Sequence, residues 1–453
     1  MKELHKKNKR KKLFNLVMLV LCYLFIFLLF KPTFGIMLMT LGCFTAMFIL
    51  NVNYAVGIVV TLYFLVPSDF LAYMFVASPF GNLPLYIIFM TFFICIGCVK
   101  SLLKRKKCVV GKNEFFVFSS LILLFILQML NFVLRQNTEI LSNSVKFFFQ
   151  TFGMLLLVKV QNLSDNDRYN IYLYILILIF ATIGVAIAEM FFDLNIYDIY
   201  GSADYSEQYN WAMSSGLSWR AKSTFVNPLV YGSTMVMCLP VIDFLRKRSN
   251  KVLFILGSIV ILVIGMALSG SRSAIIISCV FIIYYIWTSN IKQKLTLVIP
   301  CIIIAFVMVS NLDNTLILNR FLHLSGSGSV SHRLESYKIF GDIFMNNPFI
   351  GTGLGNSYKI LQKYVGNAFL TNTFDNAFMD YSMAVGGIGF MLTIISVVNA
   401  LKFIQKKNLK TSILAVDIFV LLSFFLNTTK YQSIWGLLWI YIAVDMYANT
   451  QSK

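Results

Sequence analysis

The sequence predicts an all-α polytopic integral membrane protein with about 14 transmembrane helices (12–14) and one large extracytoplasmic loop that contains short helices. Composition is the first reason: 58% of the 453 residues are hydrophobic and 13% are charged, whereas soluble domains carry roughly 25% charged residues. The second is that apolar runs close to the roughly 20 residues of a membrane-spanning helix recur along the whole chain. They leave no room for a soluble core, so residues 1–453 are expected to form a single membrane domain.

Fourteen apolar runs are the predicted spans, and an even number places both termini on one side of the membrane. Several runs are shorter than the roughly 20 residues that a perpendicular helix needs. The runs are residues 13–30, 33–50, 54–66, 85–100, 115–134, 146–160, 169–190, 228–245, 251–269, 273–289, 294–310, 381–401, 411–426 and 432–447.

Lysine and arginine predict the orientation. With the N-terminus inside, about two-thirds of the 38 Lys and Arg residues fall in the inner segments, and cytoplasmic segments of membrane proteins carry an excess of Lys and Arg. The formal net charge of +19 therefore reflects topology, and no nucleic-acid partner is expected. Both termini are expected in the cytoplasm, and the long segments 191–227 and 311–380 are expected outside.

Two arginines lie at predicted outer ends of spans. Arg220 precedes the span that begins at Asn227-Pro228, and Arg272 lies in the short turn Ser269–Ser273. An arginine at the centre of a bilayer costs at least ~2.5–3.5 kcal/mol, so Arg272 at this edge needs water, a partner or an anion. For Arg220, an arginine that snorkels to the membrane interface is the alternative.

The outer loop 311–380 is the long polar segment of the C-terminal half. Ser331 is expected to cap a helix over 332–345 that ends before Asn347-Pro348. Arg333 then lies in the first turn, where a cation opposes the helix dipole. An anion bound at the helix N-terminus would remove this conflict, and a solvated arginine is the alternative.

One face of this predicted helix carries an aromatic stripe that begins with the arginine. The spacing i, i+4, i+7, i+11 is that of one helix face, and packing is the favoured role of its aromatic part. The residues are Arg333, Tyr337, Phe340 and Phe344.

A glycine-rich segment, Gly351–Gly355, has the appearance of a phosphate cradle. No strand precedes it and no Gly-Lys-Ser/Thr follows it, so a tight turn is expected instead of a nucleotide site. The three histidines, His5, His323 and His332, show no ligand spacing. No metal and no cofactor are therefore expected.

Several short motifs follow one another in the C-terminal half, all in segments predicted to be outside. They are Arg220 with Phe225-Val226-Asn227-Pro228; Ser269-Gly270-Ser271-Arg272-Ser273-Ala274; Ser331-His332-Arg333 with Tyr337; Asn347-Pro348-Phe349-Ile350-Gly351-Thr352-Gly353; and Asp375-Asn376 with Gly386-Gly387-Ile388-Gly389. Over roughly residues 215–395, this order resembles the bacterial family of O-antigen polymerases and O-antigen ligases, which are membrane glycosyltransferases.

The resemblance implies a polysaccharide polymerase in the bacterial cytoplasmic membrane. Such an enzyme joins repeat units carried on undecaprenyl diphosphate into capsular polysaccharide, O-antigen or exopolysaccharide at the outer face, without a metal and with inversion at the anomeric carbon. Its partners are lipid-linked glycan donor and acceptor and the bilayer; a chain-length regulator and a flippase stay open as further partners. Arg220, Arg272 and Arg333 would bind the diphosphate and stabilise the charge that develops on it.

Two residues are candidates for the general base, Asp375 and His332. Ligase relatives carry a functional histidine just before the Asn of the last motif, where this chain has Phe374-Asp375-Asn376; this difference favours a polymerase. Asp375 would take the proton of the acceptor hydroxyl, and its alternative role is a helix N-cap. His332 adjoins Arg333 and is assigned a secondary contact with the diphosphate.

Substrate contacts are assigned to Asn376, Tyr337 and Asn227. Two other functions stay open: a ligase-type transfer to another acceptor, and a lipid-linked oligosaccharide flippase or other transporter. A transporter often shows an internal repeat and places paired charges in mid-membrane. No repeat is evident, and Asp417 is the charge clearly inside a predicted span.

Overall fold

The computed structural model of the protein describes residues 34–65, 76–78, 81–103, 110–192, 221–225, 227–248, 252–288, 328–357, 359–361, 374, 376–407, 409–426 and 432–448. Of residues 34–37, 76–78, 81–83, 252–253, 272, 328–336 and 432 it describes the backbone only. The predicted spans 13–30 and 294–310, together with Arg220 and Asp375, lie outside the described residues.

The regular secondary structure of the described residues is helical apart from one short hairpin, in agreement with the predicted fold class. The helices of the N-terminal half are α2 (Phe34–Ile49), α3 (Tyr54–Leu65), α4 (Leu85–Leu103), α5 (Lys112–Arg135), α6 (Thr138–Phe148), the π-helix η2 (Phe149–Gly153), α7 (Met154–Gln161) and α8 (Asp165–Phe192). Those of the C-terminal half are α10 (Pro228–Met237), α11 (Leu239–Arg248), α12 (Val252–Ser269), α13 (Arg272–Thr288), α16 (Gly328–Asn346), α18 (Ala377–Gln405), α19 (Thr411–Ser423) and α20 (Gln432–Tyr447). The hairpin pairs β1 (Val76–Ser78) with β2 (Gly81–Leu83) in antiparallel register.

Twelve of the fourteen predicted spans coincide with these helices or with parts of them. Among the described residues, six helical segments are long and apolar enough to cross a membrane: Leu85–Leu103, Lys112–Arg135, Thr138–Gln161, Asp165–Phe192, Pro228–Arg248 and Ala377–Gln405. Six further apolar helices are shorter, at 10–17 residues. Length and composition thus support a polytopic membrane protein, and the number of fourteen spans stays a prediction.

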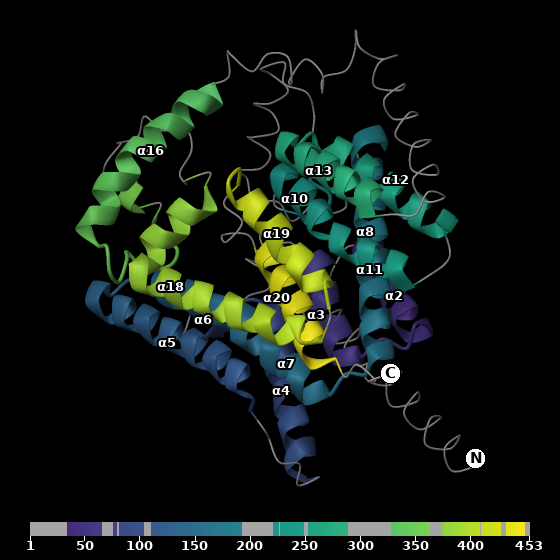
Figure 1. The fold of residues 1–453 in the computed structure, drawn as a ribbon, viewed down its shortest axis with the longest axis horizontal. Helices are drawn as coiled ribbons and strands as arrows, with labels where there is room; N and C mark the ends of the chain where they lie inside the picture. The colour runs from purple at the N-terminus through teal and green to yellow at the C-terminus, as the bar shows by residue number, and fades with distance from the viewer. Residues whose placement is uncertain are drawn as a thin grey trace.

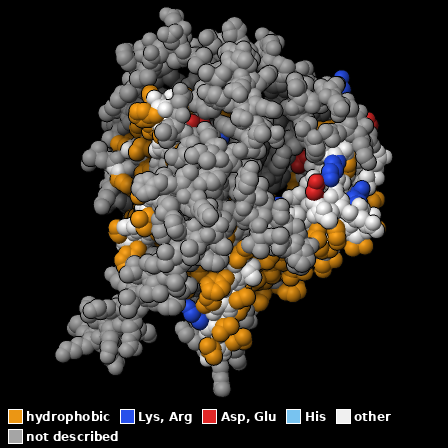
Figure 2. All heavy atoms as spheres, turned by 180° about the vertical axis from the view of Figure 1, so that it is seen from behind, with side chains coloured by type: hydrophobic (Ala, Val, Ile, Leu, Met, Phe, Trp, Pro, Cys, Tyr) orange, Lys and Arg blue, Asp and Glu red, His pale blue; other side chains and the backbone are white. Residues whose placement is uncertain are grey.

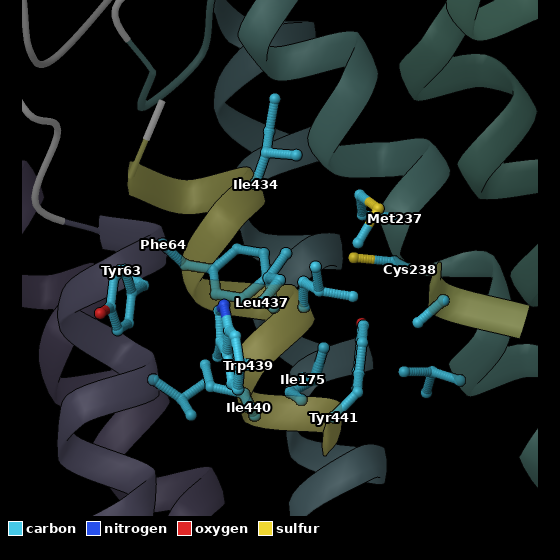
Figure 3. Packing of buried hydrophobic residues seen from close by; sticks show 14 of the residues in the cluster. Tyr63, Phe64, Ile175, Met237, Cys238, Ile434, Leu437, Trp439, Ile440 and Tyr441 are labelled. Atoms are coloured by element: carbon cyan, nitrogen blue, oxygen red, sulfur yellow. The ribbon is translucent and has the colours of Figure 1, made fainter. Parts of the chain in front are cut away.

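Helix α20 lies at the centre of the bundle. Its side chains from Ile434 onwards are buried almost without interruption, as expected for a helix that is apolar on all sides. Figure 3 shows Trp439 and Tyr441 of α20 in one cluster with Phe64 of α3 and Ile175 of α8. Burying a large apolar side chain contributes roughly 1.5–3 kcal/mol, so α20 is the element around which the other helices are held.

Helices α5 and α18 pack side by side along most of their length (Figure 1). The hydroxyls of Ser120 and Ser396 are 2.9 Å apart, and Gly389 lies against Leu124. Because the pairing residue numbers rise on one helix as they fall on the other, the two helices are antiparallel. This pair of helices contacts the described part of the predicted outer loop 311–380, which contains most of the predicted site residues.

The outer surface of α5 and α18 is apolar. Leu123, Ile126 and Val133 of α5 are 52%, 56% and 65% exposed, and Met391 of α18 is 56% exposed. On the face that Figure 2 shows, the described surface carries many hydrophobic side chains and few charged ones. Apolar surface of this extent belongs in contact with lipid.

Among the described residues, the ends of seven helices, α5, α7, α8, α11, α18, α19 and α20, meet in a network of charged side chains, which we call the basic end. Asp445 of α20 is fully buried and accepts from Arg168 Nε at 2.8 Å and from Ser412 N at 3.0 Å. Further contacts are Lys159–Glu114 at 2.5 Å, Arg248–Asp165 at 2.8 Å, and Lys407 Nζ to Met446 O at 2.6 Å. Removing one partner of a buried ion pair costs roughly 3–5 kcal/mol, so the buried pair of Arg168 and Asp445 holds the ends of α8 and α20 together.

The basic end joins the predicted inner segments 99–114, 158–168, 246–251 and 402–410 to one another. It holds the N-terminal ends of α5 and α8 and the C-terminal ends of α11 and α18. We use the name motif end for the opposite termini of these elements, with α10 and α11 taken as one span, Pro228–Arg248. They are Arg135, Glu189, Asn227 and Asn376. The structure therefore separates the segments that the charge pattern assigns to different faces.

Cysteine labelling tests this assignment of faces. In a cysteine-free background, Lys338→Cys on α16 is expected to react with a membrane-impermeant maleimide in intact cells, because α16 belongs to the predicted outer loop and this side chain is exposed. Lys406→Cys, also exposed, is the matched inner position and should react only after permeabilisation. The reverse pattern would overturn the orientation and, with it, an outer reaction site.

Candidate functional site

The glycine-rich loop after α16 pairs with a break in α18. Thr352 N and Gly353 N donate to the carbonyls of Met383 and Ala384 at 2.9 and 2.8 Å, and Gly387 N donates to Pro348 O at 2.7 Å. Gly351, Gly353 and Gly355 all have positive φ, which favours glycine. The predicted tight turn is confirmed, and the backbone N–H groups of Thr352 and Gly353 are bonded within the protein.

Gly386 makes the break possible. Its φ of 69° and ψ of 176° interrupt α18, and a Cβ placed there would lie 2.3 Å from Phe349 O. Only glycine fits a backbone of this conformation and at this distance. The break separates residues 377–385, which belong to the loop region, from the part of α18 that packs on α5.

Gly386→Ala is therefore expected to destabilise the protein by at least ~1–3 kcal/mol, the usual cost of a strained backbone. A matched control is Gly341→Ala in α16, where an added Cβ meets no atom within 4 Å and helix propensity favours alanine by roughly 0.5–1 kcal/mol. Thermal unfolding of the two purified variants is the measurement. An unfolding temperature for Gly386→Ala equal to that of Gly341→Ala would contradict the pairing.

A polar face of α5 holds this loop in place. Arg135 Nη2 donates to Asn347 Oδ1 at 2.7 Å and to Gly351 O at 3.0 Å, and Asn131 Nδ2 donates to Ile350 O at 2.7 Å. One turn earlier, Gln128 Oε1 accepts from Leu354 N at 3.1 Å. These residues were not among the predicted ones, although three polar side chains at i, i+3 and i+7 in an apolar run were a visible signal.

Helix α16 begins earlier than predicted. It runs from Gly328 to Asn346, so Ser331 is not its N-cap and Arg333 is in the second turn. The free N–H groups of a helix belong to its first four residues, which here start at Gly328. The predicted conflict between Arg333 and the dipole of the first turn is therefore wrong, whereas the predicted end before Asn347-Pro348 is confirmed.

The C-terminal half of α16 packs on the start of α18 through a small apolar cluster. Ile343, Leu361, Phe374 and Met383 are its buried members, and Phe340 stacks on Phe344 with ring centroids 5.5 Å apart. The packing role predicted for the aromatic stripe is thus confirmed for these two rings. Figure 1 shows α16 beside the N-terminal end of α18.

The cap of α18 is Asn376 and not Asp375. Asn376 Oδ1 accepts from Phe378 N at 2.9 Å and from Met379 N at 3.3 Å, the usual bonds of a helix N-cap. The alternative role of Asp375 as the cap of this helix is therefore wrong. Asp375 itself lies outside the described residues, between the buried Phe374 and this cap.

The segment after Arg220 is buried and densely hydrogen-bonded. Glu189 at the end of α8 accepts from the backbone N–H groups of Lys222 and Ser223 at 3.1 and 2.8 Å. Thr224 Oγ1 donates to Phe64 O at 2.5 Å. Ser223 has a φ of 56°, a conformation that is uncommon for residues other than glycine. The backbone of residues 221–225, which follows Arg220, is therefore held in place by hydrogen bonds.

The same segment touches the turn that carries Arg272. Ala221 N donates to Leu268 O at 3.0 Å, and Gly232 of α10 lies so close to Ser269 that an added Cβ would be 2.5 Å from its hydroxyl. Arg272 is the first residue of α13, after a left-handed Gly270. The structure thus brings the chain neighbours of these two predicted diphosphate ligands together.

The other predicted site residues that the structure describes lie on α10 and α16. Asn227 caps α10 and accepts from Val230 N at 3.0 Å. Tyr337 lies in α16 and is 38% exposed. For His332 and Arg333 the structure describes the backbone within α16. Within the described ranges, no cluster of three or more His, Cys, Asp or Glu residues is placed to hold a metal ion.

A known protein family matches the part of the chain that carries most of the motifs. Residues 257–394 match the family model described as O-Antigen ligase, and this range includes Arg272, α16, the glycine-rich loop and the start of α18. No curated protein matches the chain. The match agrees with the resemblance seen in the motifs, and it shows that residues 257–394 are similar to this family.

Proposed function

We propose that the protein is a membrane glycosyltransferase that polymerises undecaprenyl-diphosphate-linked repeat units at the outer face of the cytoplasmic membrane. The observation that supports the proposal is that the described segments next to the motifs adjoin the ends of α5, α8, α10 and α18 that are opposite the basic end. Under the positive-inside rule the basic end is cytoplasmic. The family match supports glycosyl transfer with a lipid-linked donor.

The chemistry proposed for this end needs no metal. Arg220, Arg272 and Arg333 bind the diphosphate of the donor, because a guanidinium makes bidentate contacts with phosphate oxygens and keeps its charge. The acceptor hydroxyl attacks the anomeric carbon from the face opposite the diphosphate and inverts it. Undecaprenyl diphosphate leaves, and the arginines stabilise the negative charge that develops on it.

Asp375 is proposed as the base of this reaction, within the catalytic loop 311–380. A carboxylate within hydrogen-bond reach of the acceptor hydroxyl takes its proton in the transition state. Asn376 is held rigidly by its capping bonds, so its amide group would offer a fixed donor to a sugar. His332 is proposed as a secondary diphosphate contact, and Tyr337 and Asn227 as glycan contacts.

A ligase-type transfer to another acceptor is the second candidate, because the matching family model carries the description O-Antigen ligase. The sequence Phe374-Asp375-Asn376 lacks the histidine expected of ligase relatives at this point and favours the polymerase. The two activities differ in their acceptor: a polymerase extends another lipid-linked repeat unit, and a ligase transfers the glycan to a different molecule.

Lipid-linked glycans from a strain that lacks the protein test the proposal. Loss of a polymerase should leave single repeat units on undecaprenyl diphosphate, exposed at the outer face. Loss of a ligase should leave long polymer on the same carrier. Single units trapped at the inner face would indicate a flippase and would reject glycosyl transfer.

A further inference from the structure

The glycine-rich loop lies beside the last turns of α5 and not beyond the end of that helix. Ile350 O accepts from Asn131, and Leu354 N donates to Gln128. These two α5 residues precede the C-terminal end of the helix by four and seven positions, which is roughly 6 and 10 Å along its axis. Because α5 is long and apolar enough to cross a membrane, the loop is level with part of a candidate span.

The exposed surface of the bundle is apolar up to this level. Leu130, Val133 and Leu134, in the last two turns of α5, are all exposed. On the neighbouring α18, the exposed Ile388 donates its backbone N–H to Phe349 O at 3.1 Å. The apolar surface that α5 and α18 present to lipid therefore reaches the loop itself.

Two large apolar side chains of the loop region extend this surface. Phe349 is 70% exposed, and Met345, in the last turn of α16, is 75% exposed. Lys338 and Asp342, earlier in α16, are exposed and charged, so charged groups precede the apolar ones along the helix. Exposed apolar side chains that are grouped in this way mark a contact surface, and the adjoining lipid-facing surface identifies the bilayer as its partner.

The backbone of the loop is hydrogen-bonded as a position within a membrane requires. The N–H groups from Gly351 to Leu354 all donate within the protein. The carbonyls from Pro348 to Gly353 all accept, and their donors in order are Gly387 N, Ile388 N, Asn131 Nδ2, Arg135 Nη2, Asn356 Nδ2 and Asn356 N. A loop in water can leave such groups to the solvent, whereas non-helical backbone at membrane depth persists only where the protein satisfies it.

We infer that residues 345–354 are embedded in the bilayer leaflet at the motif end, with the side chains of Met345 and Phe349 in contact with lipid. The polar side chains of α5 take the place of the water that the loop backbone would otherwise need. The segment 311–380 is then partly re-entrant and not wholly outside the membrane. The inference concerns the bilayer as a partner and depends on no step of the proposed reaction.

Spin labels at single cysteines test the inference in the full-length protein, reconstituted into lipid vesicles. In a cysteine-free background, labels at Met345→Cys and Phe349→Cys are compared with two references. Ile126→Cys, on the exposed apolar face of α5, reports the membrane, and Lys338→Cys in α16 reports water. Power saturation measures the collisions of each label with molecular oxygen, which concentrates in lipid, and with a water-soluble nickel chelate.

The labels at Met345→Cys and Phe349→Cys are expected to match the label at Ile126→Cys, with frequent oxygen collisions and a loss of nickel collisions relative to Lys338→Cys. Nickel collisions as frequent as at Lys338→Cys, at either position, would overturn the inference, because the side chain would then be in water. Few collisions with both reagents would overturn it as well, because they would show that protein, such as a second copy of this chain, covers the surface.

Photolabelling gives a second measurement on the unsubstituted protein. A diazirine phosphatidylglycerol in the vesicles should label the peptide that contains Met345 and Phe349, as it labels the peptide of α5 around Leu130, and should leave Lys338–Asp342 unlabelled. Label on the α5 peptide without label on Met345 and Phe349 would overturn the inference. Both measurements are made without substrate, so a failure of the proposed function would leave their outcome unchanged.

Discussion

Asp375→Asn is expected to abolish most polymer formation, with a loss of ~10²–10⁴ in rate, the usual contribution of a general base. The change removes the proton acceptor and keeps the shape of the side chain. Because Asn376 caps α18, the substitution does not alter a helix cap, and the amount of folded protein should be unchanged. Polymer length and quantity on gels, normalised to protein level, are the measurements.

The matched control for this variant is Asp342→Asn, the same substitution at an exposed position of α16. It should form polymer as the wild type does. His332→Ala separates the two candidate bases, and as a secondary diphosphate contact it should lose less activity than Asp375→Asn. Wild-type polymer from Asp375→Asn together with an inactive His332→Ala would reverse the assignment of the base.

Arg272→Lys and Arg333→Lys are each expected to lower the rate by ~10²–10³, as loss of one preorganised electrostatic donor does. Lysine keeps the charge, but a point charge does not reproduce the planar fork that binds two phosphate oxygens. Arg220→Lys should behave in the same way. Initial rates with purified protein and saturating lipid-linked substrate measure the effect.

Arg248→Lys is the control for these variants, because Arg248 lies at the basic end and makes a partly exposed ion pair with Asp165. Exposed ion pairs contribute at most ~1 kcal/mol, so both stability and rate should stay close to those of the wild type. Near-normal polymer from Arg272→Lys and Arg333→Lys would show that these arginines anchor the protein at the membrane surface and do not bind the diphosphate.

Hydropathy was sufficient to predict most of the helices. Long apolar runs such as 169–190 and 228–245 are stable in a bilayer as helices, because every backbone group must be bonded internally there. The uneven distribution of Lys and Arg likewise identified the segments that meet at the basic end. It could do so because Lys and Arg follow the membrane topology and not the details of packing. Glycine spacing also predicted the turn at Gly351–Gly355, since positive φ is a local property of the chain.

Contacts between distant segments were not predictable in the same way. The bonds from Gln128, Asn131 and Arg135 to the loop at 347–354 join residues more than two hundred positions apart, and no local pattern in either segment names its partner. The break at Gly386 depends on Phe349 approaching from the loop. The start of α16 was misplaced because serine is a good cap but is also tolerated within the first turn, where its N–H has no helical partner anyway.

The most direct test of the central proposal is glycosyl transfer by the purified full-length protein in lipid vesicles that contain only undecaprenyl-diphosphate-linked repeat units. The proposal predicts a ladder of polymer that grows by one repeat unit at a time, with release of undecaprenyl diphosphate and an inverted anomeric configuration at each new linkage. Repeat units that stay single while they cross the bilayer from one leaflet to the other would contradict it and would identify a transporter.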